Sequence, residues 1–285
     1  MKAHLDFFRE TDGDISKIMN ENLVPPPATG RSDYPEAYDD IPSFDCSTPF
    51  VKAQLECTRR IIDASPSDSF FLGTLHGICA SGIHPMMEAG VSYELSREIE
   101  IESLRKDEKR VLSAFRRIAD GLCELVKGYK DAGVDAVYYA ALGGEWRYLD
   151  KEDFDKWFRP FDIQIMKAIK ESGLYCFLHI CKDRLEMERY RGYEEYADVV
   201  NWGVYEAPYS LEEGRKLFPG KTVMGGLPSR HGLLVDGSDA EIRSGVKNIV
   251  ETFGRKGFIL GADCTLATEQ DMHKLRVAID TARDC

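Results

Sequence analysis

The sequence predicts an α/β protein of the (β/α)8 TIM-type barrel class, on the strength of three observations. Short apolar runs alternate along the chain with longer segments of helical spacing, which is typical of repeated βα units around a parallel sheet. A polar residue follows nearly every apolar run, as expected where a site is assembled at the carboxyl ends of barrel strands. No glycine-rich phosphate-binding turn follows the first run, and this disfavours an open doubly wound sheet.

Length and composition indicate one globular domain. The chain has 285 residues, of which 43% are hydrophobic and 30% charged, so it can bury a sizeable core. We see no internal repeat, no low-complexity tract and no change of composition along it. We therefore expect residues 1–285 to form a single barrel domain.

Net charge and the N-terminal residues restrict the possible partners and location. The formal net charge is −12, which argues against nonspecific binding of nucleic acid and against an anionic membrane surface. No apolar stretch is long enough to span a bilayer, and charged residues occur within the first ten positions. We expect a cytoplasmic protein, in which the eight scattered cysteines are mostly free thiols.

Seven apolar runs have strand length, and a closed barrel of this class needs eight strands. Either one strand escapes the pattern, or the chain starts after the strand that usually comes first. The predicted strands are 15–19, 68–73, 135–140, 174–179, 198–202, 221–226 and 257–261.

Helical spacing and end signals place the helices between these strands. Gly133 is suited to end a long amphipathic helix, Pro160 should kink or split another, and Ser238 with Glu241 forms a capping-box pattern. Residues 22–50 are rich in Pro, Asp and Ser and predict a long irregular loop. The predicted helices are 4–10, 48–64, 82–89 (or a turn), 92–104, 106–131, 151–172, 184–190, 211–217, 238–253 and 269–283.

A candidate metal site lies at the ends of two predicted strands. His179 and Cys181 are two residues apart on a strand, so their side chains point to the same side. Cys264 follows the last strand in the same way. One imidazole and two thiolates suit zinc and leave its fourth position open. Such a site favours holding a substrate thiol as a thiolate, which indicates alkyl transfer to sulfur rather than hydrolysis.

Two other interpretations of the same residues remain open at this point. His179 can be a hydrogen-bonded core histidine, with Cys181 and Cys264 as small buried apolar residues. Alternatively, Cys181 can be a nucleophile with His179 as its base, although two residues apart on one strand is an awkward geometry for that hydrogen bond.

At these residues the chain resembles the uroporphyrinogen decarboxylase superfamily, and within it the zinc-dependent methylcobalamin:thiol (coenzyme M-type) methyltransferases. Leu178-His-Ile-Cys181 and Gly261-Ala-Asp-Cys264 match the His-x-Cys and late Cys of that branch. Val223-Met-Gly-Gly-Leu-Pro228 is similar to its Gly-Gly turn. The chain departs from the branch at Lys182-Asp183, where Gly-Asn usually follows the first cysteine. The family's usual first strand also has no counterpart before residue 15, in agreement with the count of seven.

The resemblance implies a (β/α)8 barrel that transfers a methyl group from a corrinoid (methylcobalamin), carried by a partner protein, to a thiol bound at Zn²⁺. Two alternatives remain, namely a cofactor-free decarboxylase of uroporphyrinogen type and a barrel that binds a tetrapyrrole or corrinoid protein without turnover. The decarboxylase's Arg-rich N-terminal stretch is absent here. A small-molecule thiol is the expected substrate, and a homodimer is left open.

Other polar or aromatic residues near strand ends complete the candidate site. Asp263 is suited to orient a metal ligand. For each of the others, a structural or solvated role is the alternative, and the side to which Tyr139 points depends on the register of its strand. The candidate catalytic residues are Glu145, His76 and Glu206, and the candidate cofactor-binding residues are Tyr139, Trp146, Arg230 and His231.

Overall fold

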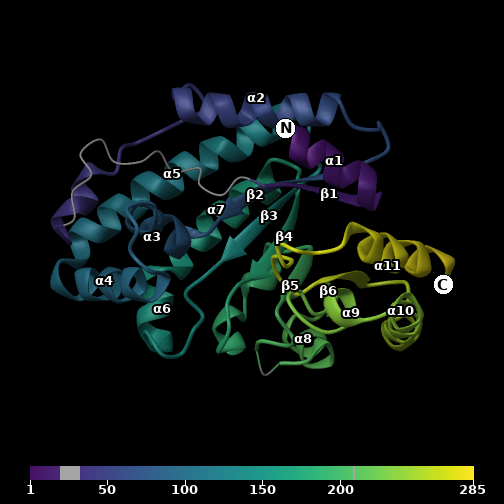
Figure 1. The fold of residues 1–285 in the computed structure, drawn as a ribbon. Coiled ribbons are helices and arrows are strands. Elements are labelled where there is room, and N and C mark those ends of the chain that lie inside the picture. The colour runs from purple at the N-terminus through teal and green to yellow at the C-terminus, as the bar shows by residue number, and fades with distance from the viewer. Residues whose placement is uncertain (20–32, 208) are drawn as a thin grey trace.

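A curled, fully parallel sheet forms the centre of the molecule (Figure 1). The computed structural model describes residues 1–19, 33–207 and 209–285. Within them, every predicted strand overlaps an observed one. The strands are β1 (Ile15–Ile18), β2 (Phe70–His76), β3 (Ala136–Ala141), β4 (Tyr175–Ile180), β5 (Val199–Trp202), β6 (Thr222–Leu227) and β7 (Phe258–Ala262).

Strand order in space follows the sequence from β1 to β7, and each strand pairs in parallel with the next. The sheet is therefore a TIM-like half-barrel in which β1 and β7 are the edges. All its strands end at the same rim, so the residues that follow them converge there.

Helices cover the outer face of the sheet (Figure 1). They are α1 (Lys2–Thr11), α2 (Pro49–Asp63), α3 (Ile78–Glu88), α4 (Tyr93–Lys106), α5 (Glu108–Ala132), α6 (Lys151–Trp157), α7 (Arg159–Glu171), α8 (Leu211–Leu217), α9 (Leu233–Asp236), α10 (Asp239–Phe253) and α11 (Met272–Asp284). None of the helices in the described residues is long and apolar enough to cross a membrane.

The predicted helix-end signals are confirmed. Gly133 adopts the left-handed conformation after α5, with φ of 92°. The Ser238 and Glu241 side chains each accept a hydrogen bond from the other residue's backbone N–H, which completes the capping box of α10. Pro160 lies in the first turn of α7, where its missing N–H has no helical partner to lose, and so it splits the predicted helix in two.

Three predicted segments need correction. A helix over 184–190 is wrong, since only Met187–Tyr190 forms a 3-10 turn; Arg184 has a φ of 52°, and Leu185 makes an antiparallel bridge to Glu145. The helix predicted from residue 82 begins four residues earlier, at Ile78. The predicted loop 22–50 lies partly outside the described residues; within its described part, Glu36–Asp40 forms a 3-10 helix.

Alternate residues of the strands contribute to two different apolar layers, because successive side chains point to opposite faces of a sheet. The outer layer, between sheet and helices, forms the large core and includes Val137, Leu178 and Val200. The inner face of the half-barrel has a smaller core, composed of Leu72, Ala136, Tyr138, Ala140, Phe177 and Val199. His179 continues this inward-facing set at the strand ends.

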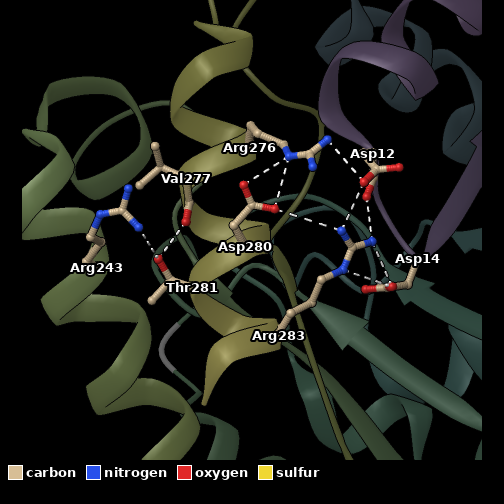
Figure 2. A network of polar contacts seen from close by, with 8 residues as sticks. All are labelled: Asp12, Asp14, Arg243, Arg276, Val277, Asp280, Thr281 and Arg283. Atoms are coloured by element: carbon tan, nitrogen blue, oxygen red, sulfur yellow. Dashed lines mark hydrogen bonds and ion pairs between the residues drawn. The ribbon is translucent and has the colours of Figure 1, made fainter.

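The two ends of the chain are fastened together by helices and ion pairs (Figure 2). Helix α11 packs on α1, and Arg283 pairs with Asp12 and Asp14 on the segment that leads into β1. Arg276 also pairs with Asp12. These contacts hold the β7 side of the sheet beside the β1 side, although β1 and β7 themselves are edge strands.

Candidate metal centre

The structure brings His179, Cys181 and Cys264 together at the rim of the half-barrel. His179 is the second-to-last residue of β4 and points inward. Cys181 follows β4 directly, and Cys264 lies two residues after β7. One ligand atom from each residue lies within 4.8 Å of the others. His179 is buried and the two cysteines are partly buried. The predicted trio therefore converges from two strand ends 83 residues apart.

The spacing of the two sulfurs fits a tetrahedral zinc ion. The Sγ atoms of Cys181 and Cys264 are 3.9 Å apart. Two sulfurs bound at about 2.3 Å in a tetrahedral site lie about 3.8 Å from each other, whereas a disulfide would need about 2.05 Å. The donor set of one imidazole and two sulfurs also suits zinc better than magnesium or calcium. These residues can therefore hold zinc with little movement of the sulfurs.

The two thiols share a proton unequally. Hydrogen bonds from the Cys181 thiol and from His179 hold the pKa of Cys264 well below its ordinary value. The pKa of Cys181 is raised because its thiol donates that bond and because it is buried. These contacts favour the thiolate form of Cys264, which is the form in which a cysteine binds a metal.

Three residues around His179 escaped the sequence-based prediction. Asn201 accepts hydrogen bonds from His179 Nδ1 at 2.5 Å and from the Tyr138 hydroxyl at 3.0 Å. The Tyr138 ring stacks on His179 with 5.1 Å between ring centres, and Lys17 Nζ lies 3.7 Å from the centre of the Tyr138 ring. The available signal was the polar Asn201 near the end of an apolar strand, level with His179 in the register.

A small pocket of about 90 Å³ opens beside the trio. Its wall includes Lys17, Thr74 and His76 from the first two strands and Tyr138 from the third. The predicted residue His76 therefore does lie at the pocket. Larger hollows, one of about 410 Å³ along Trp146, lie on the outer surface away from the trio. We assign the site to the smaller pocket because it alone of these hollows contains the candidate metal ligands.

Tyr139 is not brought to this pocket. It lies on the helix side of β3, fully buried, and its hydroxyl donates a hydrogen bond to Asp162 of α7. The strand register gives the inward position to Tyr138 instead. Asp162 also accepts hydrogen bonds from Tyr193 and from the backbone N–H of Ile78, so Tyr139 belongs to a polar network that joins the sheet to its helices.

Asp162 should make stability depend on pH. Burial raises its pKa from 3.8 to about 6, against the opposing effect of its three hydrogen bonds. The folded state therefore holds this proton more tightly, and the stabilisation present below pH 3.8 is lost as pH rises through about 6. The difference between the unfolded-state and folded-state pKa values of Asp162 corresponds to about 3 kcal/mol of unfolding free energy. In urea unfolding from pH 3.5 to 7.5, Asp162→Asn should lose this fall in stability, while Asp68→Asn, on an exposed loop, keeps it. An unchanged profile in Asp162→Asn would contradict this assignment.

Glu145 is buried on the loop after β3 and is held by its neighbours. Its carboxylate accepts hydrogen bonds from the Tyr93 hydroxyl and from the backbone N–H of Gly143, the latter at 3.1 Å. Burial, followed by the nearby Glu145 charge, raises the pKa of Tyr93, which keeps that hydroxyl protonated as the donor. Glu145 is not among the described residues that line the pocket.

The remaining predicted residues lie around the rim rather than in the pocket. Glu206, Arg230 and His231 are exposed, and Trp146 is 60% exposed. Asp263 is buried beside Cys264, and its Oδ2 accepts a hydrogen bond from the backbone N–H of Tyr205, which joins the β5 loop to the end of β7. Burial raises the Asp263 pKa to about 7, with Glu206 and Cys264 adding to the shift.

The residue after Cys181 has a backbone conformation that favours glycine. Lys182 has a φ of 88°, which residues other than glycine rarely adopt. Its ammonium lies 3.7 Å from the centre of the Tyr93 ring. Lys182 therefore links the metal-site loop to the same tyrosine that holds Glu145.

The fold and this site together define a class: a TIM-like half-barrel with a His/Cys/Cys metal-site candidate at the carboxyl ends of its strands. The sequence pattern of the uroporphyrinogen decarboxylase (URO-D) family matches residues 34–285. The chain belongs to that family. No curated protein matches the sequence.

Solved structures agree with the fold. A methyltransferase from Methanosarcina mazei is similar over 99% of this chain and 84% of its own, with a TM-score of 0.71 and 12% identity. A B12-independent methionine synthase from Shewanella sp. W3-18-1 is similar over 81% of this chain and 65% of its own (TM-score 0.53, 12% identity). A putative vitamin-B12 independent methionine synthase from Listeria monocytogenes is similar over 85% of this chain and 70% of its own (TM-score 0.53, 16% identity).

Proposed function

We propose that this protein is a zinc-dependent methyltransferase that moves a methyl group from a corrinoid, carried by a partner protein, to a small thiol. The observation that carries the proposal is the convergence of His179, Cys181 and Cys264, whose ligand atoms lie within 4.8 Å of one another beside a pocket. Family membership and the name of the similar methyltransferase support methyl transfer. The similar methionine synthases are named B12-independent, so the corrinoid donor is proposed from the resemblance of the sequence motifs alone.

Each part of the pocket has a task in this reaction. A zinc ion held by the trio would supply a Lewis acid that lowers the pKa of a substrate thiol. The chain's own residues position that ion, while Tyr138 and Leu142 form a wall that limits water. A methylcorrinoid presented by the partner would supply the methyl group and keep the electron pair of its cobalt–carbon bond, and the thiol would give its proton to solvent as the S–C bond forms.

Pocket size favours this reaction over decarboxylation of a porphyrinogen, the activity in the family's name. Sites that enclose a drug-sized ligand usually measure about 300–1,000 Å³, and this pocket measures about 90 Å³. It has room for the reacting end of a small thiol, whereas a tetrapyrrole would have to stay at its mouth. A donor that approaches from the rim, as a protein-borne corrinoid does, fits that limit.

The test is an assay with purified, zinc-loaded protein, free methylcobalamin and a panel of thiols that differ in charge. We expect loss of the methylcobalamin absorbance together with methylation of at least one thiol, and no turnover in Cys264→Ser. Carboxyl loss from uroporphyrinogen without methyl transfer would favour the decarboxylase. Binding of corrinoid with neither reaction would favour a barrel that binds without turnover.

A further inference from the structure

One side chain connects five strands directly beneath the metal-site candidate. Asn201 of β5 accepts hydrogen bonds from His179 of β4 and Tyr138 of β3. Its Nδ2 donates to the carbonyl oxygens of Met224 in β6, at 3.0 Å, and Ala262 in β7, at 3.3 Å. Asn201 is only 1% exposed, so these four partners account for its polar atoms away from water.

The four bonds determine which way the amide faces. Carbonyl oxygens only accept hydrogen bonds, so the atom that faces Met224 and Ala262 must be the NH2 group. The opposite atom is therefore the oxygen, which can only accept. His179 Nδ1 must then carry a hydrogen to make its 2.5 Å bond, which leaves the lone pair of neutral His179 on Nε2.

That tautomer is the one that a metal ligand requires. A histidine that binds a metal through one ring nitrogen commonly donates the other N–H to an oxygen acceptor, which fixes the ring and its tautomer. Nδ1 is occupied by Asn201, so Nε2 is the nitrogen that remains, and its lone pair is available to the cation when His179 is neutral. The donor side of the same amide holds Ala262, two residues before Cys264.

We infer that Asn201 is a positioning residue that fixes His179 in its Nδ1–H tautomer and aims Nε2 at the metal position. The inference rests on the metal site of the proposed function. Removing such a partner typically weakens metal affinity 10–100-fold. Asn201→Leu, of similar size, removes both the acceptor and the donor. Asn201→Asp keeps the acceptor for His179 and loses the amide donor, so it separates ring positioning from clamping of the β6 and β7 ends.

Two measurements test this on the purified protein. Chelator competition gives the zinc affinity. ¹⁵N spectra of labelled histidine side chains in the metal-free protein, recorded at a pH where His179 is neutral, give the tautomer, with the His179 signals assigned from a His179→Asn variant. We expect a zinc affinity about 10–100-fold weaker in Asn201→Leu, and a loss of the Nδ1–H form. Asn201→Asp should keep that form and an affinity within a few-fold of wild type. Asn248→Leu, the same change on an exposed face of α10, is the control and should match wild type in both.

The outcomes separate this inference from the proposed function. If wild type binds no zinc, the proposed function fails, and the tautomer spectra still test the role of Asn201. If wild type binds zinc and Asn201→Leu binds it equally well with the same tautomer, the inference is wrong. If Asn201→Asp is as weak as Asn201→Leu, the amide acts by clamping strands rather than by positioning His179, and the inference is also overturned.

Discussion

Cys264→Ser should lose zinc completely on purification, with methyl transfer falling below detection. The substitution removes the cysteine whose contacts favour the thiolate form, and a serine hydroxyl is a poor ligand for zinc at neutral pH. With Cys264 gone, only His179 and Cys181 of the described trio remain, and two ligands do not hold zinc against a chelator. Metal analysis of the dialysed protein measures the effect directly.

The matched control is Cys285→Ser, which makes the same chemical change at an exposed cysteine outside the trio. It should keep the wild-type zinc content. Circular dichroism and unfolding curves of both variants separate metal loss from misfolding. If Cys264→Ser folds and retains full zinc, the ligand assignment is wrong, whatever the activity of the variant.

The second large effect concerns an ion pair buried in α4. Arg97 and Glu100 are both fully buried and paired with each other, and Arg97 Nε and Nη2 have no further hydrogen-bond partner among the described residues. Arginine cannot shed its proton in a protein. Burial raises the pKa of Glu100, even though Arg97 opposes the rise, so Glu100 can take up a proton when Arg97 is removed. The two residues should therefore differ in their response to loss of the partner.

We expect Glu100→Met to cost about 3–5 kcal/mol of unfolding free energy, because it leaves a buried guanidinium without a counter-charge. Arg97→Met should cost clearly less, since Glu100 can take up a proton. The double variant should return to within about 1 kcal/mol of wild type or exceed it. Urea unfolding at pH 7 measures all three. Equal costs for the single variants, or additive costs in the double variant, would contradict this account.

The strands and most helices could be predicted from the sequence alone. The spacing of apolar residues and the residues that begin or end a helix are local features of the chain. Every predicted strand was found, and Gly133 and Ser238 marked helix ends correctly. The helix predicted over 184–190 failed for a non-local reason. The bridge between Leu185 and Glu145 joins two loops that are distant in sequence, and helical spacing carries no information about such a contact.

The ligands of the metal-site candidate could be predicted from the sequence, but the residues that hold those ligands in place could not. His179, Cys181 and Cys264 can be recognised by their residue types and by their positions at the ends of strands. Tyr138 and Tyr139 are identical in type, and only the register of β3 decides which one faces inward. Asn201 gains its importance from four partners on four other strands, and nothing in its own neighbourhood along the chain reveals that arrangement.

Zinc stoichiometry together with X-ray absorption at the zinc edge tests the central claim most directly. We expect about one zinc per chain, with two sulfurs at about 2.3 Å and one imidazole nitrogen at about 2.0 Å. A protein that takes up no zinc, or whose zinc has only oxygen and nitrogen neighbours, would contradict it.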